Sequence, residues 1–137
     1  MRGLVNHVDL TVKDIAASRP FYEAVLGHMG YAVSSAHERG VDFDLTTPEG
    51  VFCSIGIVRA SEDGASRPHD RYAPGLHHLA WTAADRADVD AMYQLLLDIG
   101  ATILDSPAVY PRYGPGYYAV FFADPDGLKL EYVHWPK

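Results

Sequence analysis

Hydrophobic and polar residues alternate near the N-terminus and again in the middle of the chain. The segment Val5–Val12 is rich in β-branched residues and alternates in polarity, which is typical of a half-buried strand. The segment Leu76–Ala83 repeats this pattern: an offset of 71 residues places His78 on His7 and also aligns the apolar positions. The pattern therefore predicts two equivalent strands, one at the start of each half of the chain.

An apolar stripe with helical spacing follows each of these strands. The stripe residues are Phe21, Tyr22, Val25 and Leu26 in the first half, and Met92, Leu95, Leu96 and Ile99 in the second. Asp14 and Asp85 occupy matching positions near the two expected helix starts, and Ser18 and Asp85 are the alternative capping candidates. Glycines near Gly27–Gly30 and at Gly100 are expected to end the two helices.

Three short strands are expected after each helix. They cover about Tyr31–Ser35, Val41–Thr47 and Val51–Val58 in the first half, and Thr102–Leu104, Tyr117–Ala123 and Leu128–Val133 in the second. Thr47–Gly50 and Asp124–Gly127 have the Pro, Asp and Gly content of tight turns, so they are expected to join the last two strands of each half. Six additional residues of the second half are placed in the loop Asp105–Gly116.

Each half therefore predicts the order βαβββ, and the chain predicts an α+β fold of two tandem modules. The first module covers about residues 1–58 and the second about 76–137, within a single domain of residues 1–137. Residues 59–75 consist largely of Ser, Glu, Asp, Gly, Arg and Pro, which predicts a linker or a mobile flap.

Strand parity selects a set of candidate metal ligands. The apolar residues of the first strand are expected to pack under the helix, which turns His7 to the opposite face. The same parity selects His78 in the second module and leaves His77 on the packed face or at the rim. Glu131 lies among apolar residues of the last strand, where it is a ligand, an exposed strand residue or a partner of Lys or Arg. Two His and one carboxylate suit Fe(II), Mn(II), Zn(II) or Ni(II), so we expect one divalent metal held by His7, His78 and Glu131.

A loop rich in Tyr and Gly, Tyr110–Tyr118, precedes the strand expected to pair with the strand of Glu131. A turn centred on residues 125 and 126 would place Val120 opposite Glu131, with Tyr118 on the same face. A slip of one residue would place Tyr117 there instead.

This loop supplies the candidate catalytic residues Tyr118, Arg112 and Tyr113. Tyr118 could donate a hydrogen bond to a metal-bound oxyanion, and Arg112 or Tyr113 could hold an anionic or aromatic substrate. The alternative is that the tyrosines only pack the loop, with their hydroxyls at the surface.

Composition narrows the possible functions. Cys53 is the only cysteine, which excludes an intramolecular disulfide and a thiolate metal cluster. A net charge of -7 argues against nucleic acid as a partner. No run of eighteen apolar residues predicts a membrane span, and the first residues lack the apolar stretch of a signal peptide, so the expected location is cytoplasmic.

Five motifs together resemble the vicinal oxygen chelate superfamily, which includes glyoxalases, bleomycin resistance proteins and extradiol dioxygenases. The motifs are Asn6–Leu10, Phe21–Tyr22 with Val25–Gly27, His78–Ala80, Asp124–Gly127, and Leu130–Glu131. The resemblance implies that the two modules form a cup-shaped, partly open β-barrel with the helices outside. It also implies ligands from the first strand of each module and the last strand of one, which match His7, His78 and Glu131.

The resemblance implies an enzyme that chelates neighbouring oxygens of a small substrate on a Lewis-acidic metal, in a dioxygenase-, lyase- or transferase-like reaction. The alternative is a metal-free protein that sequesters a ligand, as bleomycin resistance proteins do. Ser54 stands where lactoylglutathione lyases usually have a further Glu ligand, so efficient activity of that kind is not expected. Open sheet edges and short relatives favour a homodimer, with no nucleic-acid or membrane partner.

Overall fold

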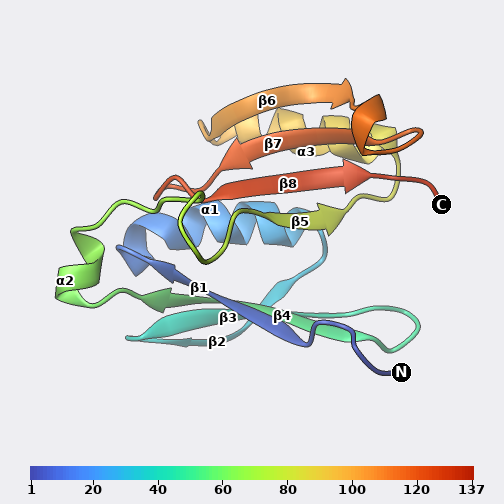
Figure 1. The fold of residues 1–137 in the computed structure, drawn as a ribbon. Helices are drawn as coiled ribbons and strands as arrows, with labels where there is room; N and C mark the ends of the chain where they lie inside the picture. Colours follow the sequence, from blue (N-terminus) through green and yellow to red (C-terminus); the bar gives the residue numbers. More distant parts are fainter. The chain divides into compact units, whose positions relative to one another are not determined.

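The computed structural model describes all residues 1–137, and they form two compact units, Met1–Arg67 and Pro68–Lys137. Each unit has the order βαβββ and contains one open, four-stranded mixed sheet (Figure 1). The predicted α+β class and the two βαβββ modules are therefore confirmed.

The first unit contains the sheet order β1-β4-β3-β2. Its elements are β1 (His7–Val12), α1 (Ile15–His28), β2 (Ala32–His37), β3 (Gly40–Thr46) and β4 (Phe52–Arg59). β1 is parallel to β4, whereas the other neighbours are antiparallel. A short helix, α2 (Glu62–Ala65), begins in the segment predicted as a linker, where the Ser61 hydroxyl accepts from Gly64 N at 2.9 Å.

The second unit repeats this order as β5-β8-β7-β6. Its elements are β5 (Leu79–Thr82), α3 (Arg86–Asp98), β6 (Thr102–Val109), the 3-10 turn η1 (Pro111–Tyr113), β7 (Tyr118–Ala123) and β8 (Lys129–His134). β5 is parallel to β8, and the other pairs are antiparallel. β6 is longer than the predicted Thr102–Leu104, because its pairing with β7 resumes after irregularities around Asp105.

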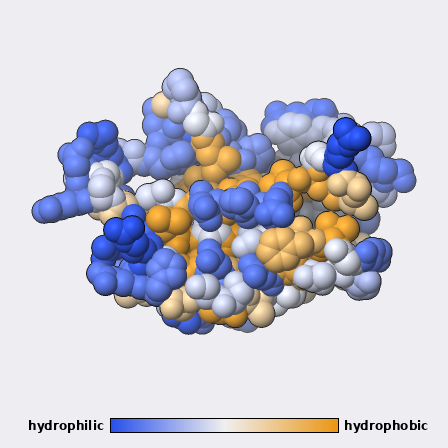
Figure 2. All heavy atoms as spheres, turned by 90° about the horizontal axis from the view of Figure 1, so that it is seen from below, coloured by the Kyte–Doolittle hydropathy of each residue, from blue (hydrophilic) through white to orange (hydrophobic).

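Each helix covers one face of the sheet in its own unit (Figure 1). α1 buries Tyr22, Val25 and Leu26, and α3 buries Met92 and Leu96, as the two apolar stripes predict. α3 also buries Val89, which the stripe did not include, whereas Ile99 of the stripe lies past the end of α3 and is 41% exposed. Burying a side chain of this size stabilises a fold by roughly 1.5–3 kcal/mol. Figure 2 shows the molecule from below, with hydrophilic and hydrophobic residues interspersed on that side. No helix is long and apolar enough to cross a membrane.

Aspartates cap both helices, which confirms the candidate Asp85 and adds Asp14. Asp14 accepts from Ala16 N at 3.0 Å, and Asp85 accepts from Asp88 N at 2.8 Å. Such caps satisfy backbone N–H groups that have no partner within the helix. Ser18, the other candidate, is not the cap: it lies inside α1 and is fully buried.

The two predicted turns are present, and each closes a hairpin of the same length. Gly50 N donates to Thr47 O at 2.8 Å, and Gly127 N donates to Asp124 O at 3.0 Å. Both glycines have φ of 85°, a conformation that other residues rarely adopt. Each connection spans five residues, since Thr46 pairs with Phe52 and Ala123 pairs with Lys129.

The five-residue connection corrects one predicted register. Phe121, not Val120, pairs with Glu131, so the assumption of a turn centred on two residues was wrong by one position. Because side chains alternate along a strand, this shift exchanges the faces of Tyr117 and Tyr118. Tyr117 therefore shares the face of Glu131, which is the alternative that the sequence left open.

Candidate metal and ligand site

Glu131 is the buried acidic residue at the centre of the candidate site in the second unit. It lies in the middle of β8, with Ala80 of β5 and Phe121 of β7 as its strand neighbours. Only 1% of its surface is exposed. A buried carboxylate needs strong partners to offset the loss of hydration, so its contacts define the chemistry of this site.

Both oxygens of Glu131 are hydrogen-bonded within the second unit. His78 Nε2 lies 3.1 Å from Oε1, and the Tyr117 hydroxyl donates to Oε2. On the other side of the His78 ring, its Nδ1 lies 2.7 Å from Nδ1 of His77. These contacts form a continuous chain from the exposed His77, through His78 and Glu131, to Tyr117.

Tyr117 is held in its protonated form. Burial raises the pKa of its hydroxyl well above the usual value, and the hydrogen bond to the Glu131 carboxylate raises it further. The neutral phenol therefore persists across the physiological range as a hydrogen-bond donor beside the carboxylate.

The cavity next to Glu131 has mainly aromatic walls. It measures about 350 Å³, and its lining residues are His77, His78, Tyr113, Tyr117, Phe121, Lys129, Glu131 and Trp135. The Tyr113 and Tyr117 ring centroids are 5.2 Å apart, as are those of Tyr117 and Trp135. Lys129 Nζ lies 4.7 Å from the centre of the Phe121 ring, so one cation is present at an otherwise apolar wall.

A glycine makes room for Trp135. A Cβ atom added at Gly114 would come within 2.8 Å of three atoms of the indole ring. Gly114 also has φ of 148°, which other residues seldom adopt. The tyrosine-rich loop therefore depends on glycine to let the C-terminal indole reach the cavity.

The three predicted catalytic residues lie in different places. Tyr113 lines the cavity, and the guanidinium of Arg112 donates to its hydroxyl at 2.7 Å while stacking on its ring. Tyr118 lies on the opposite face of β7, where its hydroxyl donates to Asp90 of α3 at 2.6 Å. Its predicted place beside Glu131 is therefore wrong, because the register differs by one residue.

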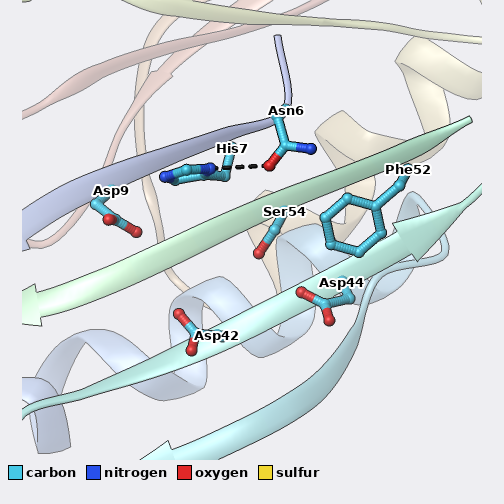
Figure 3. A pocket seen from close by; sticks show the side chains of 7 residues that line it. All are labelled: Asn6, His7, Asp9, Asp42, Asp44, Phe52 and Ser54. Carbon is cyan, nitrogen blue, oxygen red and sulfur yellow. Dashed lines mark hydrogen bonds between the residues drawn. The ribbon is translucent and has the colours of Figure 1, made fainter.

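His7 lies in a separate, polar pocket of the first unit (Figure 3). This pocket measures about 330 Å³, and its lining residues are Asn6, His7, Asp9, Asp42, Asp44, Phe52 and Ser54. His7 Nδ1 is 2.9 Å from Asn6 Oδ1, and the other ring nitrogen points away from Asn6 (Figure 3). Ser54 is the direct strand partner of His7.

The donor set fits a divalent metal in part. His78 Nε2 and Glu131 Oε1 are both borderline-to-hard donors, they are 3.1 Å apart, and they open on the same cavity. His7, the third predicted ligand, belongs to the other unit. No group of three or more His, Cys, Asp or Glu side chains in the structure is placed to hold a metal ion.

Sequence reasoning did not assign Phe121, Lys129, Trp135 or His77 to this site. Trp135 follows the last strand, and nothing in its sequence context indicates that it lines a cavity. His77 was expected on the packed face or at the rim; it is exposed, and its bond to His78 was not foreseen. Its position directly before His78, matching Asn6 before His7, is the available signal.

Comparisons with known proteins agree with this architecture. The chain is 33% identical over 129 residues to the uncharacterized protein YqjT of Bacillus subtilis (strain 168), covering 94% of this chain and 97% of the relative. A crystal structure assigned to the glyoxalases, from Bacillus halodurans, has a TM-score of 0.82 and 29% identity over 98% of this chain and 97% of that one. Lactoylglutathione lyase from Agrobacterium tumefaciens has a TM-score of 0.68 at 18% identity, over 97% of this chain and 94% of that one, which shows a shared fold only.

Two tandem βαβββ units are the arrangement that the resemblance to the vicinal oxygen chelate superfamily implies. The sequence model of the Glyoxalase/Bleomycin resistance protein/Dioxygenase superfamily matches residues 4–132, nearly the whole chain. The chain belongs to this superfamily.

Proposed function

We propose that this protein is a metal-dependent enzyme that acts on a small substrate through two neighbouring oxygen atoms. The observation that carries the proposal is the contact between the half-buried His78 and the buried Glu131, whose Nε2 and Oε1 atoms are 3.1 Å apart beside an aromatic cavity. Burying a carboxylate in a β-strand until only 1% of the residue is exposed costs free energy of hydration, unless a positively charged partner offsets that cost. His7, in the first unit, stays a sequence prediction as a further ligand.

A divalent metal bound there would supply Lewis acidity toward an enolate or another oxyanion of the substrate. The residues of the chain provide the remaining functions. Tyr117 offers a phenol proton next to Glu131, and its raised pKa keeps that proton in place at neutral pH. Its hydroxyl is therefore suited to donate to a substrate oxygen when one competes with the carboxylate.

The cavity walls favour a planar, apolar substrate body. Tyr113, Phe121 and Trp135 present aromatic rings, and such rings stack on flat ligands at low conformational cost. Lys129 is the cation in the lining and would attract a negatively charged substituent. The proposed substrate is therefore a small aromatic or conjugated molecule with two adjacent oxygens.

Metal analysis tests this proposal most directly. Protein purified without oxygen or chelators is expected to carry one equivalent of Fe, Mn, Zn or Ni per chain, and apo-protein is expected to bind Zn²⁺ in titration calorimetry. His78→Ala should abolish binding, whereas His37→Leu, which removes an exposed histidine of β2, should leave it intact. A screen of catechols and 2-oxoaldehydes with the loaded protein would then identify the reaction.

A metal-free ligand-binding protein is the second candidate. The observation that favours it is that both oxygens of Glu131 have hydrogen-bond partners within the chain, His78 and Tyr117. Tight binding of an aromatic ligand to protein that shows no metal affinity would support this candidate. The predicted homodimer stays a prediction, and light scattering after size exclusion would test it.

A further inference from the structure

We infer that Asn6 and His77 are matched positioning residues, each orienting the imidazole of the histidine that follows it so that Nε2 is the nitrogen presented to a metal. The inference rests on the proposed metal site and adds two residues to it. Asn6 and His77 are separated by the same 71 residues that separate His7 and His78, so the device is repeated in both units.

In the first unit, an oxygen fixes the protonation of the ring. Asn6 Oδ1 lies 2.9 Å from His7 Nδ1 and is a hydrogen-bond acceptor, so Nδ1 must carry the proton (Figure 3). In the neutral ring the lone pair then belongs to Nε2, which points away from Asn6. A histidine ligand typically donates its other ring N–H to such a partner, which fixes both the tautomer and the ring orientation.

In the second unit, the imidazole of His77 has the role that the side-chain amide of Asn6 has in the first unit. The two Nδ1 atoms of His77 and His78 are 2.7 Å apart, so one ring donates and the other accepts. Their bond turns Nε2 of His78 toward Glu131 Oε1, at 3.1 Å. The edge of the His77 ring is supported by Tyr72, with ring centroids 5.5 Å apart.

Asn6 and His77 differ in the hydrogen-bonding roles that they can take toward the neighbouring histidine. Asn6 Oδ1 can only accept, whereas a neutral His77 can use Nδ1 as a donor or as an acceptor. When the proton of His78 is on Nε2 and is donated to Glu131, Nδ1 of His78 accepts from Nδ1 of His77. With Nε2 ligating, the proton of His78 resides on Nδ1 and is donated to His77, whose own proton resides on Nε2. Each ring keeps one proton in both states.

The test replaces the positioning residue, His77 or Asn6, and keeps the histidine that it orients. His77→Leu should weaken Zn²⁺ binding by about 10–100-fold, whereas His77→Asn, which restores an acceptor like Asn6, should stay within about threefold of the parent. Asn6→Leu and Asn6→Asp form the corresponding pair in the first unit, and His37→Leu is the control for loss of an exposed histidine. Urea unfolding of the apo-proteins would show that the exposed sites tolerate these changes.

Nitrogen-15 NMR of the imidazoles in apo-protein gives a readout that needs no metal. Nδ1 of His7 should be the protonated nitrogen, and this preference should be lost in Asn6→Leu and kept in Asn6→Asp. Equal weakening of Zn²⁺ binding by His77→Leu and His77→Asn, or a proton on Nε2 of His7, would overturn the inference. Absence of Zn²⁺ binding by the parent would refute the proposed function, while the tautomer of His7 would still decide whether Asn6 positions the ring.

Discussion

The two βαβββ units have the same strand order and the same five-residue hairpin connection, yet they place different chemistry on the open face. In the first unit His7 pairs with Ser54 and is surrounded by carboxylates in an open, polar pocket. In the second unit Glu131 is buried beneath aromatic rings and bonded to His78 and Tyr117. The equivalent position of the last strand holds Ser54 in the first unit and Glu131 in the second. This difference distinguishes the polar pocket of the first unit from the candidate metal site of the second.

The strand registers differ as well. His7 lies directly opposite Ser54, whereas Ala80 lies opposite Glu131 and His78 precedes Ala80 by two positions. Because side chains two positions apart share a face, His78 still reaches the carboxylate from just outside the strand. The comparison teaches that strand parity selects which residues face the site, while register determines which of them meet.

The largest expected effect comes from removing the carboxylate that distinguishes the two units. Glu131→Gln should lower Zn²⁺ affinity by more than the roughly 10–100-fold typical of positioning residues, because a direct donor loses its charge. Ser54→Ala, the matching change in the first unit, should leave the affinity nearly unchanged. Titration calorimetry on both variants checks this, and similar losses in the two would remove the distinction between the units.

The absence of a carboxylate at Ser54 predicts a limit on activity. A serine hydroxyl is a poor general base without an activating neighbour, so the parent protein should turn over the methylglyoxal–glutathione hemithioacetal far below the usual enzyme range of about 1–10³ per second. The assay is run with Ni(II), Zn(II), Mn(II) and Fe(II) in turn. Ordinary turnover with any of them would show that Ser54 does not set this limit.

The register of β7 predicts unequal effects for two adjacent tyrosines. Tyr117→Phe removes a donor to a buried carboxylate and should lower the free energy of unfolding by roughly 1.5–3 kcal/mol, as for other bonds to charged groups. Tyr118→Phe removes the more exposed bond to Asp90 and should cost about 0.5–1.5 kcal/mol. Urea unfolding without metal measures both, and a larger loss for Tyr118 would favour the register that the structure rejects.

The smallest expected effect is a pH dependence at Tyr118. Its hydrogen bond to Asp90, together with burial, raises its pKa in the folded state above the unfolded value of about 10. Above that pH the unfolded chain loses this proton first, so the contribution of Tyr118 to stability is complete below pH 10 and declines above it. Stability should thus fall slightly more steeply at alkaline pH in the parent than in Tyr118→Phe, as followed by urea unfolding at several pH values.

Periodicity and repeat symmetry were sufficient to predict most of the fold. They located both βαβββ units, the cap at Asp85, and the turns ending at Gly50 and Gly127. The length of β6 was underestimated, since its irregular pairing around Asp105 hides the alternation on which strand prediction depends. For the site, parity correctly turned His78 and Glu131 to one cavity, and left His77 at its rim.

The sequence by itself determined the types of side chain available and the faces they occupy, because alternation along a strand is a local property of the backbone. Only the tertiary structure decided that Tyr117 rather than Tyr118 meets Glu131, since a five-residue connection shifts the pairing by one position. It also decided that His77 bonds to His78 and that Trp135 reaches the cavity past Gly114. These contacts depend on register and on the path of irregular segments, which no periodic pattern encodes.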